Sequence, residues 1–175
     1  MESAAYSKDF FLKRNYAERN AAADLAACVR VLTEPGAAVV LCIGSDKSVY
    51  DCFGPLVGRY LKEMSSLCVY GTLEETVNAM NIGYYIDKIK YRHPDKKIIV
   101  VSASSGNAEQ KGEICVENAP FVVCDRGSDR NRTVGNISIT GITRILGMLS
   151  ETEGRLSLVC EMSATLANAL TLALD

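Results

Sequence analysis

The chain has 175 residues, of which 48% are hydrophobic and 23% charged, and its formal net charge is −2. These totals predict one globular domain over residues 1–175, long enough to bury a sizeable core. The slight negative charge and the pI near 5.5 provide no broad attraction to nucleic acid or anionic lipid, so we expect partners of neither kind. The apolar stretches fall short of the roughly 18 to 20 residues that a membrane span needs.

The cysteines predict reduced and mostly buried thiols. Their number is odd, none forms a CxxC pair and most stand in apolar runs, which argues against a disulfide scaffold or a zinc site. No secretory signal is apparent at the start of the sequence, so we expect a cytoplasmic protein. The seven are Cys28, Cys42, Cys52, Cys68, Cys115, Cys124 and Cys160.

In chain order, residues 1–15 mix charges with aromatic residues and predict a flexible arm or a short docking helix. The run AAVVLCI at residues 37–43 lacks polar alternation and is typical of a strand buried on both faces of a parallel sheet. Further strands are predicted at residues 67–70 and 97–101, with short edge strands or hairpins at 113–116, 121–124 and 136–140.

Apolar residues at helical spacing predict helices at residues 17–32, 53–64, 74–92, 142–149 and 158–174. Pro55 suits the first turn of the second helix, where its missing N–H is harmless. The last helix is apolar on most sides, so either the sheet covers it or it forms a subunit contact in a homodimer. Strands that alternate with helices predict an α/β fold, a three-layer sandwich of a mostly parallel sheet with helices on both faces.

Polar residues follow three of the predicted strands, at Ser45, Asp46 and Asp51, at Thr72 and at Ser102. The carboxyl ends of parallel strands meet at one edge of a sheet, where α/β folds bind their ligands. Right-handed crossovers would bring the loop after Gly44 beside the loop after Val101. The spacing therefore predicts a polar crevice at this edge.

Several of these residues have structural alternatives that the pattern leaves open. Asp51 is either a site residue or the cap of the following helix, and Asp46 is also a common turn residue. Glu74 and Glu75 suit the first turn of a helix, and His93 suits a helix end better than a catalytic site. The charged loop at residues 125–132 is typical of a solvated surface. Ser102 has no neighbouring histidine to activate it, and GxSxG, Walker and GxGxxG motifs are absent.

Three motifs in order, CIGSDKSVYDCFGPLVG, VYGTLEETVNAMN and VGNISITGI, make the chain resemble the sporulation protein YyaC family of spore-forming bacteria. The resemblance covers residues 37–170. It implies a fold similar to the germination protease of spores and to hydrogenase-maturation endopeptidases, a hydrogenase-maturation-protease or phosphorylase-like sandwich. It extends the predicted crevice to Gly44, Gly71, Asn78 and Thr140.

By that resemblance Asp51 matches the acid after the first strand, which binds metal in the maturation enzymes and acts in the germination protease. The second acid of the family, in an IDA-like motif, falls at Ser102, and its histidine falls at Asn78, with Thr76 in place of a proline. The Pro-Gly-rich loop corresponds to the divergent residues 123–127. Two-carboxylate hydrolysis needs one group to activate water and another to protonate the leaving amine, and serine does neither unaided.

The resemblance therefore implies a sporulation-associated protein of the mother cell or forespore cytoplasm, with a peptidase-like fold. We expect it to be non-catalytic and to bind a peptide or protein partner at the strand-end crevice. The alternative is an active peptidase that processes a spore or maturation substrate, using Asp51 with Asp46 or with a divalent metal held by Asp51. No other cofactor is implied.

Overall fold

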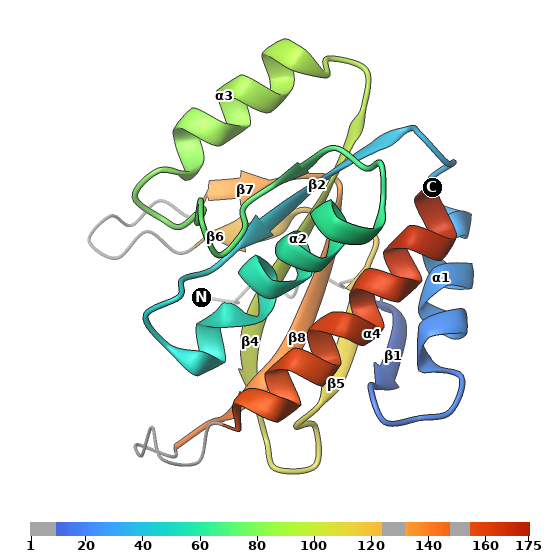
Figure 1. Cartoon of the computed structure of the whole chain (residues 1–175), viewed down its shortest axis with the longest axis vertical. Coiled ribbons are helices and arrows are strands. Elements are labelled where there is room, and N and C mark those ends of the chain that lie inside the picture. The colour runs from blue at the N-terminus through green and yellow to red at the C-terminus, as the bar shows by residue number, and fades with distance from the viewer. Residues whose placement is uncertain (1–9, 124–131, 148–154) are drawn as a thin grey trace, which may run out of the picture.

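The computed structural model describes residues 10–123, 132–147 and 155–175, in which six strands form one sheet with the order β1-β5-β8-β4-β2-β3 (Figure 1). Strands β3, β2, β4 and β8 are mutually parallel, and β5 runs antiparallel to both of its neighbours, β8 and β1. A separate hairpin joins β6 and β7. The elements are β1 (Phe10–Asn15), α1 (Ala21–Leu32), β2 (Ala38–Ile43), the 3-10 helix η1 (Val49–Cys52), α2 (Phe53–Met64), β3 (Val69–Tyr70), α3 (Ile82–Arg92), β4 (Lys97–Gly106), β5 (Glu113–Glu117), β6 (Phe121–Val123), β7 (Arg132–Val134), β8 (Ile137–Ile145) and α4 (Leu156–Leu174).

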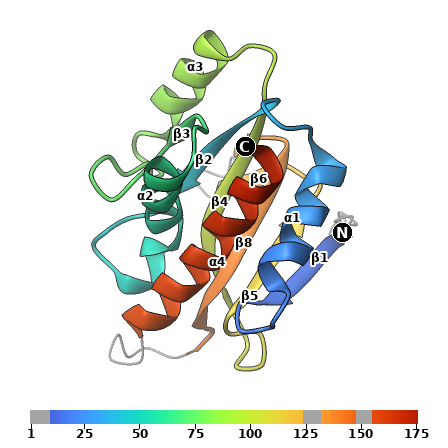
Figure 2. The same ribbon diagram turned by 45° about the vertical axis from the view of Figure 1, so that its right-hand side comes forward.

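Helices α1, α4 and α2 lie side by side over the first face of the sheet (Figure 2). Their apolar residues enclose Val40, Ile99, Ile114 and Ile139, which point to this face from four neighbouring strands. All four side chains are fully buried. The face is therefore the main core of the molecule, built from a complete apolar layer.

Helix α4 is the only described helix that is long and apolar enough to cross a membrane by length and composition. It packs between α1 and α2, and its Met162, Leu166 and Leu170 side chains are fully buried in the core. The sequence left two interpretations of this helix open, coverage by the sheet or a subunit contact. For the buried face of the helix, coverage by the rest of the chain is correct. Such burial is typical of a core helix in a soluble domain.

The second face carries helix α3 over β2 and the start of β4, away from the other helices (Figures 1 and 2). Its apolar cluster contains Leu41 and Val100 from the sheet and Ile89 from α3. On β8 and β5, the side chains that point to this face are mostly polar. The predicted three-layer α/β sandwich with helices on both faces is confirmed. The second face is covered less completely than the first, because α3 covers only β2 and the start of β4.

Two predicted helices were wrong in extent or type. Residues 74–81 are not helical, because they cross the end of β2, where the Gly44 N–H donates to the Val77 carbonyl, and then turn at Asn78 and Asn81. The Asn78 N–H donates to Asn81 Oδ1 at 2.8 Å, and such local bonds compete with helix. The helix predicted at 142–149 is instead the end of β8 up to Ile145.

The order of the strands also corrects the prediction. Phe10–Asn15, expected in an arm or docking helix, is strand β1, and residues 1–9 lie outside the described residues. Strands β5 and β8, expected as edge strands or hairpins, are interior strands of the six-stranded sheet. Most of the charged loop at 125–132 and Cys124 lie outside the described residues, and the other six cysteines are free thiols.

Candidate functional site

Asp51 lies in η1, the short helix between β2 and α2. The chain turns tightly here: the Ser45 N–H donates to the Asp51 carbonyl at 3.1 Å, and the Asp51 N–H donates to the Ser48 carbonyl. Gly44 permits this turn, since a Cβ at its position would lie 2.2 Å from the Asp51 carbonyl oxygen. The glycine therefore fixes where Asp51 stands relative to the end of β2.

The Asp51 carboxylate lines a hollow of about 260 Å³, called here the Asp51 hollow. Its opposite wall comes from the carboxyl ends of β4 and β8, as the crevice hypothesis predicted for β2 and β4. The Thr143 hydroxyl donates to the Tyr50 carbonyl at 2.8 Å and so ties η1 to β8. The lining residues are Ser48, Tyr50, Asp51, Ala103, Ser104, Ser105, Thr143 and Arg144.

Asp51 is half-buried, and burial raises the pKa of its carboxyl group. No side-chain hydrogen bond caps the first turn of α2, so the interpretation of Asp51 as a helix cap was wrong. The Arg144 guanidinium also lines the hollow and lies 5.8 Å from the centre of the Tyr50 ring. The described lining residues thus combine one carboxyl group with several hydroxyl groups and one cation.

The resemblance implied a metal at Asp51, and this donor set does not fit one. Divalent cations in proteins take several carboxylate, imidazole or thiolate ligands. Asp51 is the only such group among the described lining residues, and the Arg144 cation shares the hollow. No group of three or more histidine, cysteine or acidic side chains suited to a metal occurs among the described residues.

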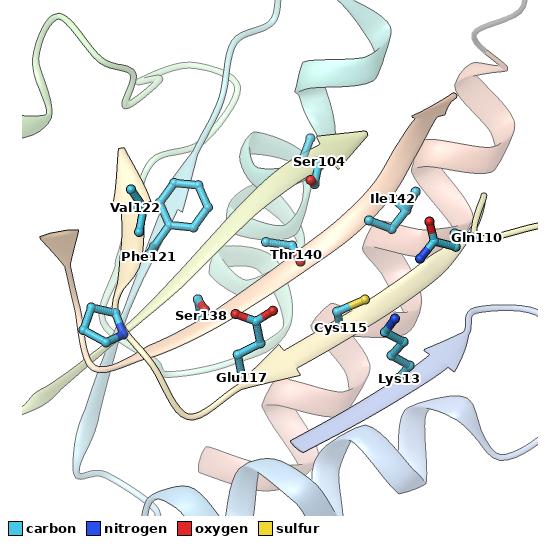
Figure 3. A pocket seen from close by; sticks show the side chains of 12 residues that line it. Lys13, Ser104, Gln110, Cys115, Glu117, Phe121, Val122, Ser138, Thr140 and Ile142 are labelled. Carbon is cyan, nitrogen blue, oxygen red and sulfur yellow. The ribbon is translucent and has the colours of Figure 1, made fainter. Parts of the chain in front are cut away.

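A second hollow of about 370 Å³ lies on the second face of the sheet, where β1, β5, β8 and β4 run side by side (Figure 3). We call it the sheet-face hollow. Strand register explains its floor, because Lys13, Cys115 and Thr140 stand opposite one another on three adjacent strands. It is lined by Lys13, Gln110, Cys115, Glu117, Ser138 and Thr140, by Ala103, Ser104 and Ile142, and by Pro120, Phe121 and Val122.

Burial raises the pKa of the Cys115 thiol to about 11. This effect outweighs those of Lys13 and of a hydrogen bond with Thr140, both of which lower the pKa. The thiol is therefore protonated at neutral pH and acts here as a polar wall rather than as a nucleophile. Ala103 and Ser104 line both hollows, so the Asp51 hollow and the sheet-face hollow adjoin each other at the end of β4.

The structure brings together only part of the predicted crevice. Ser102 was expected in a loop, but it lies inside β4, which continues to Gly106, and it is 6% exposed and does not line the Asp51 hollow. Thr140 lines the sheet-face hollow instead. The remaining predicted residues support the turns around β2 or lie near them without lining either hollow: Gly44, Ser45, Asp46, Gly71, Thr72 and Asn78.

Two of these residues show what that support consists of. The buried Thr72 hydroxyl accepts the Glu75 N–H at 3.3 Å, and the Asn78 side chain accepts the Met80 N–H at 3.0 Å. Glu75 itself accepts a hydrogen bond from the Tyr85 hydroxyl at 2.7 Å, outside any helix. Both acids of the Glu74 and Glu75 pair therefore precede α3 instead of forming its first turn.

The sequence prediction missed the residues that complete both hollows, among them Ser104, Ser105, Thr143 and Lys13. A signal for some of them was present. Residues 137–141, ISITG, alternate with a period of two, which is typical of a strand with one apolar and one polar face. A strand was predicted at 136–140, and applying this alternation to it would have put Ser138 and Thr140 on one face.

Fold and site together define a class: an α/β sandwich of the hydrogenase-maturation-protease type with Asp51 in a hollow at the carboxyl edge of its sheet. The NiFe hydrogenase maturation protease HycI from Thermococcus kodakarensis KOD1 has a similar structure, with a TM-score of 0.53 and 18% sequence identity. The similarity covers 81% of this chain and 97% of that protein.

The sequence places the chain more narrowly. The family described as "Protein of unknown function (DUF1256)" matches residues 13–169. The "Uncharacterized protein YyaC" of Bacillus subtilis (strain 168) is 34% identical over 139 residues, which cover 77% of this chain and 68% of that protein. The chain belongs to the DUF1256 family, with YyaC as a relative.

Proposed function

We propose that this protein is a non-catalytic relative of the peptidases that share its fold, and that it binds a peptide or protein partner at the Asp51 hollow. The observation that carries the proposal is that Asp51 is the only acid among the described residues that line that hollow. Across from Asp51, the ends of β4 and β8 provide the hydroxyl groups of Ser104, Ser105 and Thr143. None of these replaces the second titratable group that peptide hydrolysis requires.

Asp46 does not supply the missing group in this arrangement, because it is exposed and does not line the hollow. An open hollow with serine hydroxyl groups and the Asp51 carboxyl group instead offers donors and acceptors to the backbone and polar side chains of a peptide. The adjoining sheet-face hollow extends the surface over which an extended segment can lie.

The biological setting is part of the same proposal. The resemblance to the YyaC family supports a role in sporulation and a place in the cytoplasm of the mother cell or forespore. The peptidase-like fold supports a partner that is a protein or peptide, since the protein of similar structure is named a hydrogenase maturation protease and proteases act on polypeptides.

The test is an assay of cleavage and binding with the same candidate partners. Purified protein is incubated with small spore proteins, with and without nickel or zinc, and mass spectrometry and calorimetry follow cleavage and binding. We expect saturable binding without cleavage. Ser105→Arg places a bulky cation in the Asp51 hollow and should weaken binding at least about tenfold.

Ala108→Arg is the matched control, because it adds the same side chain at an exposed turn three residues away and should leave binding unchanged. Cleavage by the wild type that disappears in Asp51→Asn would establish the peptidase alternative instead, for which the raised pKa of Asp51 would suit a general acid. Binding that Ser105→Arg leaves intact would remove the Asp51 hollow as the docking site.

A further inference from the structure

The sheet ends at β3, which lies between α2 and α3 (Figure 2). A hollow of about 420 Å³, called here the edge hollow, runs beside this strand, and the four consecutive residues 67–70 line it. Lys62 from the last turn of α2 lines it as well, and so do Arg92 and His93 at the end of α3. The edge hollow therefore occupies the place where a further strand would pair with β3.

The edge hollow is lined by more positive than negative charge. Lys62, Lys88 and Arg92 provide three cations, whereas Glu75 is the one acid among the described lining residues. The Glu75 carboxylate is already engaged, because it accepts a hydrogen bond from the Tyr85 hydroxyl at 2.7 Å. Among the described residues, neither Lys62 nor Arg92 takes part in a hydrogen bond or an ion pair. Two cations are thus available to an anionic partner.

The inner wall of the edge hollow is held in place by aromatic contacts. The Lys88 ammonium group lies over the Tyr70 ring, 5.7 Å from its centre, and the Tyr70 hydroxyl lies 3.1 Å from His93 Nε2. Burial lowers the pKa of His93, and the charges of Lys96 and Arg92 lower it further. An anion in the hollow would oppose these charges and raise this pKa. His93 is the single histidine of the chain, so it can report binding without interference.

The cations flank the edge of the sheet from both sides. Successive side chains of a strand point to opposite faces of its sheet. In a strand added beside β3, one side chain would therefore point toward Lys62 on the side of α2, and the next toward Arg92 on the side of α3. Two adjacent acidic residues suit this arrangement.

Two other occupants suit the edge hollow less well. A second copy of the chain, paired edge to edge through β3, would bring Lys62 and Arg92 close to the same cations of the first copy. A nucleic acid would supply negative charge, but it has no peptide N–H and C=O groups to pair with the free side of β3. An extended polypeptide meets both requirements.

We propose that an extended segment of a partner protein, with two adjacent acidic residues, adds to the sheet as a strand beside β3. The backbone of the segment pairs with the free side of β3, and its two carboxylates face Lys62 and Arg92. The edge hollow shares no lining residue with the Asp51 hollow, so this site does not depend on the function proposed above.

The test begins with the unmodified protein and the blocked hexapeptide TVEEVT as probe. One control peptide, TVQQVT, lacks the carboxylates, and the other is TVEEVT with N-methyl groups on both glutamates, which blocks pairing as a strand. Nuclear magnetic resonance of the His93 imidazole follows binding. We expect saturable binding of TVEEVT with a raised His93 pKa, and at least about tenfold weaker binding of each control peptide.

Three results would overturn the proposal. The first is no binding of TVEEVT at millimolar concentrations, and the second is equal binding of either control peptide. The third is equal or tighter binding of hexathymidylate or inorganic phosphate, which would make the edge hollow a site for phosphate groups instead of a strand.

Variants then test the two cations. Lys62→Gln and Arg92→Gln are each expected to weaken TVEEVT about threefold, and the double variant about tenfold. Lys90→Gln, which removes an exposed cation of α3 outside the hollow, is the matched control and should change binding little. A double variant that melts like the wild type and binds TVEEVT equally well would refute the assigned cations. Ser105→Arg should leave TVEEVT binding intact, so failure of the function proposed above can be told apart from failure of this site.

Discussion

The two faces of the sheet are built from the same strands, yet they differ in what covers them. On β8, Ile137 and Ile139 point to the first face and are buried under the helices, whereas Ser138 and Thr140 point to the second face and line a hollow. Strand β5 repeats the division, with Ile114 on the first face and Cys115 on the second. Along β5 and β8, the first face therefore supplies stability, and the second face leaves polar groups available for binding.

Neighbouring residues of β8 provide the strongest test of this division. Ile139→Ala empties a fully buried position on the first face, and we expect it to lower the free energy of unfolding by about 3 kcal/mol. Thr140→Ala changes the next residue, on the second face, and should cost less than about 1 kcal/mol. Urea unfolding measures both values. Similar losses at the two positions would mean that the second face also supports the fold.

Two helical glycines allow the packing of α2 on the first face to be compared with the packing of α3 on the second face. In α2, a Cβ on Gly58 would lie 1.9 Å from the Gly71 carbonyl oxygen, which is backbone and cannot move aside easily. We therefore expect Gly58→Ala to destabilise the protein by about 2 kcal/mol, despite the better helix propensity of alanine. In α3, the nearest atom to a Cβ on Gly83 is the end of the Arg132 side chain, 3.4 Å away.

Gly83→Ala is accordingly expected to stabilise the protein, by up to about 1 kcal/mol, because the propensity gain meets no fixed obstacle. Thermal unfolding of the two variants should shift in opposite directions. A stabilising Gly58→Ala would show that α2 can move away from the sheet, and the first face would then be less rigid than the contact with Gly71 indicates.

The same contrast explains what the sequence could predict. Residues 37–64 were predicted almost to the residue, since a wholly apolar strand and Pro55 in a first turn leave little choice. The end of β8 was misread because Gly141 looks like a break. Gly141 does not end the strand. A glycine is required at this position for packing, because a Cβ on residue 141 would lie 2.7 Å from the Phe53 ring.

The site was predictable only where it depended on strand order near β2. Asp51 could be selected because it follows a strand whose end is clear from the sequence. The wall that faces Asp51 was predicted at Ser102, whereas it lies further along the chain, at Ser104 and Ser105. The length of β4 is set by its pairing with β8, from Ile99 opposite Ile137 to Gly106 opposite Ile145. The end of β4 therefore cannot be predicted from the sequence of residues 97–106 alone.

The smallest expected effect concerns the charge of Asp51. Since burial raises its pKa above the ordinary value near 3.8, the native state keeps a proton that the unfolded state releases as pH rises through that window. Stability contributed by this group is therefore lost on going from pH 3 to pH 7. Asp51→Asn should raise the free energy of unfolding at pH 7 by at most about 1 kcal/mol, because Asp51 is only half-buried, and should change it little at pH 3.

Asp46→Asn removes an exposed carboxylate from the same loop and is expected to alter neither value measurably. Denaturant unfolding at the two pH values, with both variants, measures the difference. A lower stability of Asp51→Asn at pH 7 would mean that the ionised carboxylate is held by a favourable contact in solution. The Asp51 hollow would then resemble the first face of the sheet, in which side chains serve the fold, more than the polar second face, in which they remain available to a ligand.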